Sequence, residues 1–108
     1  MKLRIALIQM QVEMGNPEKN FAHAREMMEE AMERKPDILV LPETWDVGFF
    51  PKENLADLAD REGKKTVRLL SETASRFGVN IVGGSTAVRE GNDIFNRSMV
   101  FDRKGDLI

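Results

Sequence analysis

The chain has 108 residues, 42% hydrophobic and 31% charged, which is the composition of one soluble globular domain. Its formal net charge is −2, with 16 basic and 18 acidic residues. The sequence therefore lacks the basic surface that binding to a nucleic-acid backbone requires. It contains no cysteine, which excludes disulfides, thiolate metal sites and a cysteine nucleophile within these residues.

The apolar run from Leu3 to Met10 predicts a β-strand buried on both faces of a sheet, because polar residues do not alternate with the apolar ones. Glutamines interrupt the run and no small-residue cleavage site follows it, so we interpret it as a strand and not as a signal peptide. No stretch approaches the length needed to span a membrane. We therefore expect a cytoplasmic protein without membrane contact.

Residues 16–18 (Asn-Pro-Glu) predict a helix start, with Asn16 as the N-cap and Pro17 at the first helical position. Helical spacing of apolar residues continues from Phe21 to Ala31, and Pro36 ends the helix because the residue before a proline avoids helical geometry. Residues 37–41 then form a short apolar segment, which predicts a central strand parallel to the first. The order strand, helix, strand indicates a βαβ unit.

Residues 46–63 are predicted to be irregular, with a short helix around residues 54–60. A second full helix is predicted over residues 64–77, with Gly78 as its C-cap. Residues 79–82 form the third strand. Residues 85–90 and 94–102 flank a turn at 91–93, and we expect this hairpin to add an antiparallel strand to the sheet.

A further turn at residues 103–106 is followed by Leu107 and Ile108, which have the character of the first residues of another strand. No cap and no polar tail follow this apolar pair. We therefore expect residues 1–108 to be the N-terminal portion of a single larger α/β domain whose C-terminal part is absent.

Glu43 lies two residues beyond the predicted second strand, and ligands of open α/β sheets bind at the carboxyl ends of the strands. Pro42 stiffens the exit from that strand. Trp45, Phe49 and Phe50 predict an apolar wall, which would make a neighbouring carboxylate a stronger base. The alternative is that Glu43 begins a solvated loop or caps the short helix, and its position alone does not decide between the two.

Five segments in order, RIALIQMQ, GNPEKN, PDILVLPETW, VNIVGGS and IFNRSMVFDRKGDLI, resemble the nitrilase superfamily of carbon-nitrogen hydrolases over essentially the whole chain. The resemblance implies the N-terminal half of an α-β-β-α sandwich with a mixed sheet. LPETW matches the motif that carries the family's catalytic glutamate, which falls on Glu43. The segments PETWDVGFFP, ENLADLAD and NIVGGS look most like the branch of omega-amidases and a methionine-salvage amidase, which hydrolyse amides of short dicarboxylic or 2-oxo acids.

The resemblance implies that a cysteine thiolate attacks a small amide substrate, that Glu43 acts as general base and passes the proton to the departing ammonia, and that a lysine stabilises the oxyanion. Neither partner is found in the chain, because Lys64, Lys65 and Lys104 do not occupy the motif position. The resemblance places both beyond Ile108, so we predict that the chain alone is inactive. It implies no metal, no organic cofactor and a homo-oligomer at full length.

Asn96, in IFNRS, matches a family position written Tyr-Asn, with Phe95 in place of the tyrosine. With Trp45 and Phe49 it is a candidate pocket residue, although an asparagine in an edge hairpin is often only solvated. Asp46 could orient a pocket group, but no pattern supports that role. The pair Gly83-Gly84 allows either a close backbone approach to a ligand or a bend.

Two other classes of function make different demands on the sequence. A nucleotide-binding module requires a glycine-rich turn between the first strand and the first helix, and residues 11–20 hold a single glycine. A non-catalytic fragment or association module would expose an unpaired strand edge and uncovered apolar surface.

Overall fold

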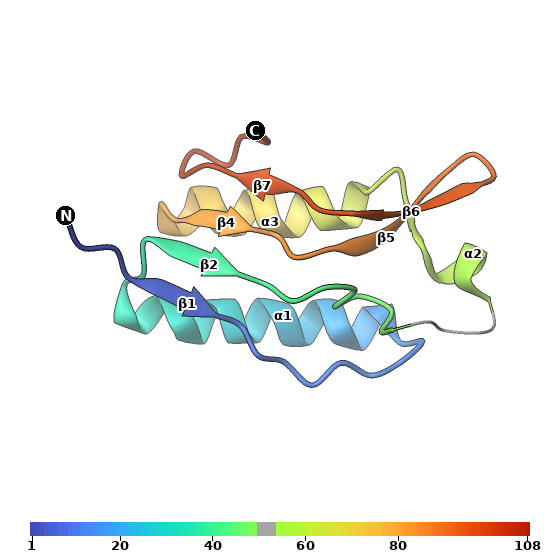
Figure 1. Cartoon of the computed structure of the whole chain (residues 1–108), viewed down its shortest axis with the longest axis horizontal. Helices are drawn as coiled ribbons and strands as arrows, with labels where there is room; N and C mark the ends of the chain where they lie inside the picture. Colours follow the sequence, from blue (N-terminus) through green and yellow to red (C-terminus); the bar gives the residue numbers. More distant parts are fainter. Residues whose placement is uncertain (50–53) are drawn as a thin grey trace.

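A four-stranded mixed sheet forms the centre of the molecule (Figure 1). The computed structural model describes residues 1–49 and 54–108. The strands β1 (Ile5–Leu7), β2 (Ile38–Val40), β4 (Asn80–Val82) and β7 (Val100–Phe101) lie in the order β1-β2-β4-β7. The first three are parallel and β7 is antiparallel to β4. The predicted βαβ start and mixed sheet are confirmed.

Helix α1 (Pro17–Ala31) begins where the sequence predicts, because the Asn16 side chain accepts a hydrogen bond from the Lys19 N–H and Pro17 occupies the first turn. A short 3-10 turn, η1 (Met32–Arg34), follows it. Lys35 then adopts left-handed backbone geometry, with φ of 50°, and ends the helical segment before Pro36.

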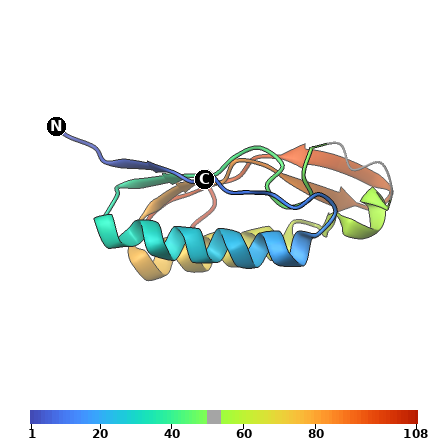
Figure 2. The same cartoon turned by 90° about the horizontal axis from the view of Figure 1, so that it is seen from below.

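Helix α3 (Lys64–Phe77) also has its predicted bounds, and Gly78 ends it in the left-handed region with φ of 63°. Figure 2 shows α1 and α3 on the same side of the strands. The core lies between these helices and the sheet. Its largest fully buried apolar side chains include Met28, Leu39, Leu70, Ile81 and Phe101.

The predicted hairpin forms, but it belongs to a second sheet. β3 (Asp60–Arg61), β5 (Thr86–Glu90) and β6 (Asp93–Arg97) make a three-stranded sheet in the order β3-β5-β6, next to the short helix α2 (Leu55–Leu58). The prediction that the hairpin joins the main sheet is therefore wrong, as is a single strand over residues 94–102. The chain changes sheet twice, at Gly83-Gly84 and at Ser98-Met99, and the Gly83 N–H donates to the Met99 carbonyl where the two crossings meet.

The first strand is buried on one face only, which corrects the expectation from its apolar run. The side chains of Leu3, Ile5 and Leu7 are 56%, 53% and 68% exposed, and Val82 on β4 is 36% exposed. Both long helices cover the opposite face, so the alternate residues of each strand have no layer above them in the described part of the chain. We call this apolar surface of Ile5, Leu7 and Val82 the open face.

The last residues extend the main sheet slightly. Leu107 forms an isolated antiparallel bridge with Phe101, and the Ile108 N–H donates to the Val100 carbonyl at 2.9 Å. The expectation of a further strand after the turn at 103–106 agrees with this pairing. None of the helices within residues 1–49 and 54–108 is long and apolar enough to cross a membrane.

Candidate active site

Residues 41–48, which we call the Glu43 loop, leave the carboxyl end of β2 and run beside the segment that follows β4. The Leu41 N–H donates to the Val82 carbonyl at 3.0 Å, and the Ser85 N–H donates to the Pro42 carbonyl at 3.2 Å. Ser85 also accepts from the Thr44 N–H through its hydroxyl, at 2.8 Å. Glu43 is therefore presented by backbone that is hydrogen-bonded on both sides of it.

Gly84 makes this close approach possible. A Cβ atom at Gly84 would overlap the carbonyl oxygens of Pro42 and Leu41, and its φ of 60° is in the left-handed region. The glycine pair lies where the chain bends from one sheet to the other, which agrees with the second interpretation, and its close backbone contact is with the protein's own Glu43 loop.

Glu43 opens onto a hollow of about 330 Å³ at the junction of the two sheets. The Asn96 side-chain amide, on β6, donates to Glu43 Oε2 at 3.1 Å. Phe49 lines the same hollow. Three of the four predicted site residues are therefore together, and the other lining residues are Thr44, Val47, Gly48, Leu55, Ala87, Ile94 and Phe95. Phe50, the remaining member of the predicted apolar wall, lies outside the described residues.

Trp45 does not line this hollow. Its side chain is fully buried in the main core, where the indole N–H donates to the Gly83 carbonyl at 2.9 Å and the ring meets Phe21 edge to face at 4.8 Å. Thr44, at φ of 49°, reverses the chain direction between Glu43 and Trp45. As a result Glu43 is exposed and Trp45 is an anchor of the loop, which corrects its assignment to the pocket wall.

Asp46 is the loop's second carboxylate, and its side chain is completely buried. The Ala87 N–H on β5 donates to its two oxygens at 3.0 Å and 3.2 Å. Burial raises the pKa of the Asp46 carboxyl to about 6, because the charged form loses hydration; the N–H groups of Ala87 and Val47 oppose the rise and the nearby charge of Asp60 adds to it.

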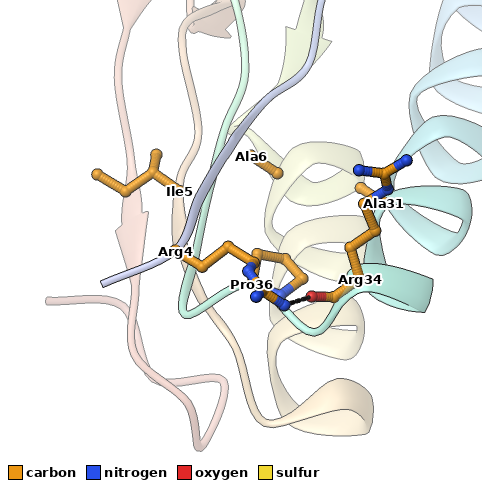
Figure 3. Close-up of a pocket in the computed structure, with 6 residues that line it drawn as sticks. All are labelled: Arg4, Ile5, Ala6, Ala31, Arg34 and Pro36. Atoms are coloured by element: carbon orange, nitrogen blue, oxygen red, sulfur yellow. Dashed lines mark hydrogen bonds between the residues drawn. The ribbon is translucent and has the colours of Figure 1, made fainter. Parts of the chain in front are cut away.

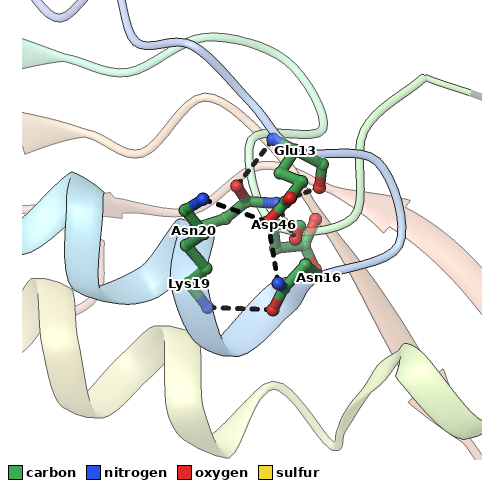
Figure 4. Close-up of polar contacts among 5 residues, drawn as sticks. All are labelled: Glu13, Asn16, Lys19, Asn20 and Asp46. Atoms are coloured by element: carbon green, nitrogen blue, oxygen red, sulfur yellow. Dashed lines mark hydrogen bonds and ion pairs between the residues drawn. The ribbon is translucent and has the colours of Figure 1, made fainter.

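Asn20 on α1 holds the loop from the other side (Figure 4). Its buried side-chain amide donates to the carbonyl oxygens of Asp46, at 2.7 Å, and Glu13, at 2.8 Å. Asn20 was not predicted to matter, although the sequence carries a signal: it precedes Ala24 and Met28 at four-residue spacing, so it is a polar residue on the buried stripe.

A larger hollow, of about 640 Å³, lies at the opposite end of the strands (Figure 3). Arg4, Ile5, Ala6, Ala31, Arg34 and Pro36 line it. The guanidinium of Arg4 donates a hydrogen bond to the Arg34 carbonyl at the end of η1. This hollow offers no carboxylate and lies at the amino ends of the strands, so the chemistry of the described residues points to the Glu43 hollow.

The Glu43 hollow supplies an accessible carboxylate whose orientation is set by one amide donor, within mainly apolar surroundings. Such a group can accept a proton from a molecule held in the hollow. Among residues 1–49 and 54–108, no three histidine, aspartate or glutamate side chains gather closely enough to hold a metal ion.

Comparison with known proteins gives a consistent result. The family model described as carbon-nitrogen hydrolase matches residues 4–108. The chain is 38% identical to 2-oxoglutaramate amidase of Bacillus subtilis (strain 168) over 108 residues, which are 100% of this chain and 41% of that protein. It is 30% identical to the chloroplastic omega-amidase of Arabidopsis thaliana, covering 98% of this chain and 30% of that protein.

Solved structures agree. A CN-hydrolase superfamily protein of Xanthomonas campestris superimposes with a TM-score of 0.83 at 30% identity, covering 98% of this chain and 38% of that chain. Nit3 of Saccharomyces cerevisiae, a nitrilase superfamily member, shares the fold with a TM-score of 0.79 at 24% identity, covering 98% of this chain and 42% of that chain. The chain spans about 40% of the length of several curated relatives that it matches.

Proposed function

The chain belongs to the carbon-nitrogen hydrolase family, and from this premise we propose that a longer protein containing it is an amidase that releases ammonia from a small carboxamide. The observation that carries the proposal is the position of Glu43: an exposed carboxylate at the carboxyl end of β2, in a hollow, with Asn96 donating to it at 3.1 Å. Glu43 is the general base in this proposal.

In the proposed reaction a cysteine thiol outside residues 1–108 attacks the amide carbonyl carbon. Glu43 accepts the thiol proton and delivers it to the amide nitrogen as the C–N bond breaks, so that ammonia leaves. A lysine, also outside these residues, stabilises the oxyanion. Glu43 then takes a proton from the water that attacks the thioester carbon, and returns it to the cysteine sulfur as the C–S bond breaks and the carboxylic acid leaves. The Asn96 donor at Oε2 keeps the carboxylate in one orientation through these transfers.

The proposed substrate is an ω-amide of a dicarboxylic or 2-oxo acid. Support comes from two relatives, a 2-oxoglutaramate amidase and an omega-amidase. Phe49 and Asn96 remain candidate substrate-pocket residues, because both line the hollow that Glu43 opens onto.

We further propose that residues 1–108 are the N-terminal portion of one domain, and that this portion alone is inactive. Support comes from the coverage of about 40% of several relatives and from the open face, which a further layer would bury. A homo-oligomeric state and a cytoplasmic location complete the proposal. Sedimentation of the longer protein and fractionation of its cells test these two points.

The activity is tested by reading the coding region past Ile108, expressing the longer protein and measuring ammonia release from 2-oxoglutaramate. We expect turnover by the longer protein and none by residues 1–108. Glu43→Gln should lower kcat by about 10⁴-fold, because the catalytic groups act as a unit. Glu33→Gln, at an exposed position in η1, is the matched control and should leave kcat unchanged. Full activity of Glu43→Gln would contradict the proposal.

A second candidate function, an association module, is favoured by the open face. Exposed apolar residues on one face of a sheet, here on β1 and β4, are characteristic of surfaces that bind another layer. Sedimentation of residues 1–108 tests it: self-association would support this function for the isolated chain, and a stable monomer would count against it.

A further inference from the structure

The two carboxylates of the Glu43 loop are three residues apart and have opposite environments. Glu43 is exposed, whereas Asp46 is fully buried and directed at β5. A buried carboxylate costs stability unless hydrogen bonds and a structural role offset the lost hydration. In the described residues, helix capping explains the other buried carboxylate, Asp60, which accepts from Lys65 N–H and Thr66 N–H at the start of α3. Asp46 caps no helix.

Asp46 instead connects three elements. Its carbonyl oxygen accepts from Asn20 on α1, and its carboxylate accepts from Ala87 on β5. Ala87 is the cross-strand partner of Asn96 on β6. Asn96 in turn donates to Glu43, which lies in the same loop as Asp46. Glu43 and Asp46 are therefore connected twice. They belong to the same loop, and they are also linked across the hairpin by the Glu43–Asn96 hydrogen bond, the Asn96–Ala87 strand pairing and the Ala87–Asp46 hydrogen bond.

We propose that Asp46 is a positioning residue: by holding Ala87, it fixes the register of the β5–β6 hairpin against the Glu43 loop and so sets Asn96 on the Glu43 carboxylate. Within residues 1–49 and 54–108, the hydrogen bonds that join the hairpin itself to the Glu43 loop are the Asp46–Ala87 contact and the Asn96–Glu43 contact that it supports. Ser85 precedes β5 and contacts the loop at Pro42, Thr44 and Trp45. Without Asp46, Asn96 would be held against the loop only by its own contact with Glu43 and, at a distance along β5, by the contacts of Ser85 and the pairing of β5 with β3. The catalytic consequence of losing Asp46 rests on the proposed function, whereas the structural link does not.

The charge of Asp46 gives the link a measurable signature. The carboxyl has a pKa of about 6, so it changes charge within an accessible pH range. A carboxylate accepts a stronger hydrogen bond from Ala87 than a neutral carboxyl does. The charge that acts on it is that of Asp60 on β3, and the neutral amide of Asn20 on α1 contacts the Asp46 carbonyl oxygen. The position of Asn96 should therefore respond to pH around 6.

The first experiment follows the Asn96 side-chain amide of the 108-residue chain by NMR from pH 4.5 to 8. We expect an inflection near pH 6 in the unmodified chain. Asp46→Asn keeps an acceptor for Ala87 and removes the titration, so the inflection should disappear. Asp60→Asn is the matched control: burial still raises the Asp46 pKa, and only the smaller contribution of the Asp60 charge is lost, so the inflection should persist at a slightly lower pH. An inflection near pH 6 that survives Asp46→Asn would overturn the proposal, and so would its absence from the unmodified chain.

The second experiment uses the longer protein. Asp46→Ala leaves Ala87 without its acceptor, and we expect kcat per folded molecule to fall between about tenfold and hundredfold with KM unchanged, as for a misplaced catalytic group. Asp46→Asn should restore most of kcat above pH 7. If Asp46→Ala unfolds, the pH dependence of kcat in Asp46→Asn tests the positioning role instead: compared with the unmodified protein, it should lack one ionisation near pH 6. Equal kcat for all variants overturns the positioning role, whereas an inactive unmodified protein refutes the proposed function and leaves the NMR result standing.

Discussion

The Glu43 loop and the open face differ in how completely the described residues pack and hydrogen-bond them. In the loop, backbone and side-chain groups from Leu41 to Asp46 are bonded to residues 82–87, and Trp45 is fully buried. On the open face, Leu7 is 68% exposed although it is as apolar as Leu39, which is fully buried in the neighbouring strand. The candidate catalytic base thus occupies a region that the described residues complete by themselves, while the region they leave uncovered contains none of the predicted site residues.

The largest effect should come from breaking the completed region at Gly84. We expect Gly84→Ala to lower the free energy of unfolding by about 4 kcal/mol or more, because the added Cβ would overlap the Pro42 carbonyl oxygen. Gly91→Ala is the matched control: Gly91 has the same φ of 60° with no atom within 4 Å of its Cβ position, so the substitution should cost about 1 kcal/mol. Urea denaturation measures both, and equal losses would contradict the close approach.

The two faces of the sheet can be compared directly by making the same change, leucine to alanine, on each face. Leu39→Ala removes fully buried atoms and should cost about 2 to 5 kcal/mol. Leu7→Ala, on the open face, should cost less than about 0.5 kcal/mol in the 108-residue chain. The same denaturation series measures both. A large loss for Leu7→Ala would show that this face is covered in solution.

Asp46 makes the loop's stability depend on pH. Its pKa is raised from 3.8 to about 6, so the folded state binds its proton more tightly than the unfolded state does. The free energy of unfolding should therefore fall as pH rises from about 4 to about 7, by about 3 kcal/mol at most. Asp46→Asn should remove this fall while retaining the Ala87 contact. Denaturation at a series of pH values checks it, and parallel curves for the two proteins would refute it.

The smallest effect on stability should follow from Asn96→Ala. Asn96 is exposed and its contact with Glu43 is at the surface of the hollow, so we expect a loss below about 0.5 kcal/mol. In the longer protein the same substitution should lower kcat more than it lowers stability. An unchanged kcat would mean that Asn96 does not orient the base.

Elements with local signals were predictable from the sequence. Asn16 and Pro17 set the start of α1, and Gly78 sets the end of α3, because caps depend on a few adjacent residues. The burial of β1 was not predictable in the same way. An apolar strand such as Ile5–Leu7 shows what a surface is able to bury, but whether a layer covers it depends on residues distant in sequence.

In the candidate site, too, residues with a local sequence signal were predictable, and residues positioned by distant partners were not. The location of Glu43 at the hollow was predictable because a motif and the end of a strand coincide there, and that of Asn96 because it matches a family position; their roles stay predictions. Trp45 was misplaced, since its partner Gly83 is 38 residues away and no local pattern reveals that bond. No local pattern supports a role for Asp46 for the same reason: its donor, Ala87, is 41 residues away.

The long sequence separation of these bonds also has a kinetic consequence. Ser85 and Thr44 are 41 residues apart, and the segment between them contains α3 and β4, so their hydrogen bond requires this segment to close on itself beside the β2–β4 pair. Closing a segment of that length costs chain entropy before any contact in the loop is made. Residue Glu43 should therefore reach its final orientation among the last steps of folding, and the amide of Thr44 should gain protection from hydrogen exchange later than the amides of the two helices.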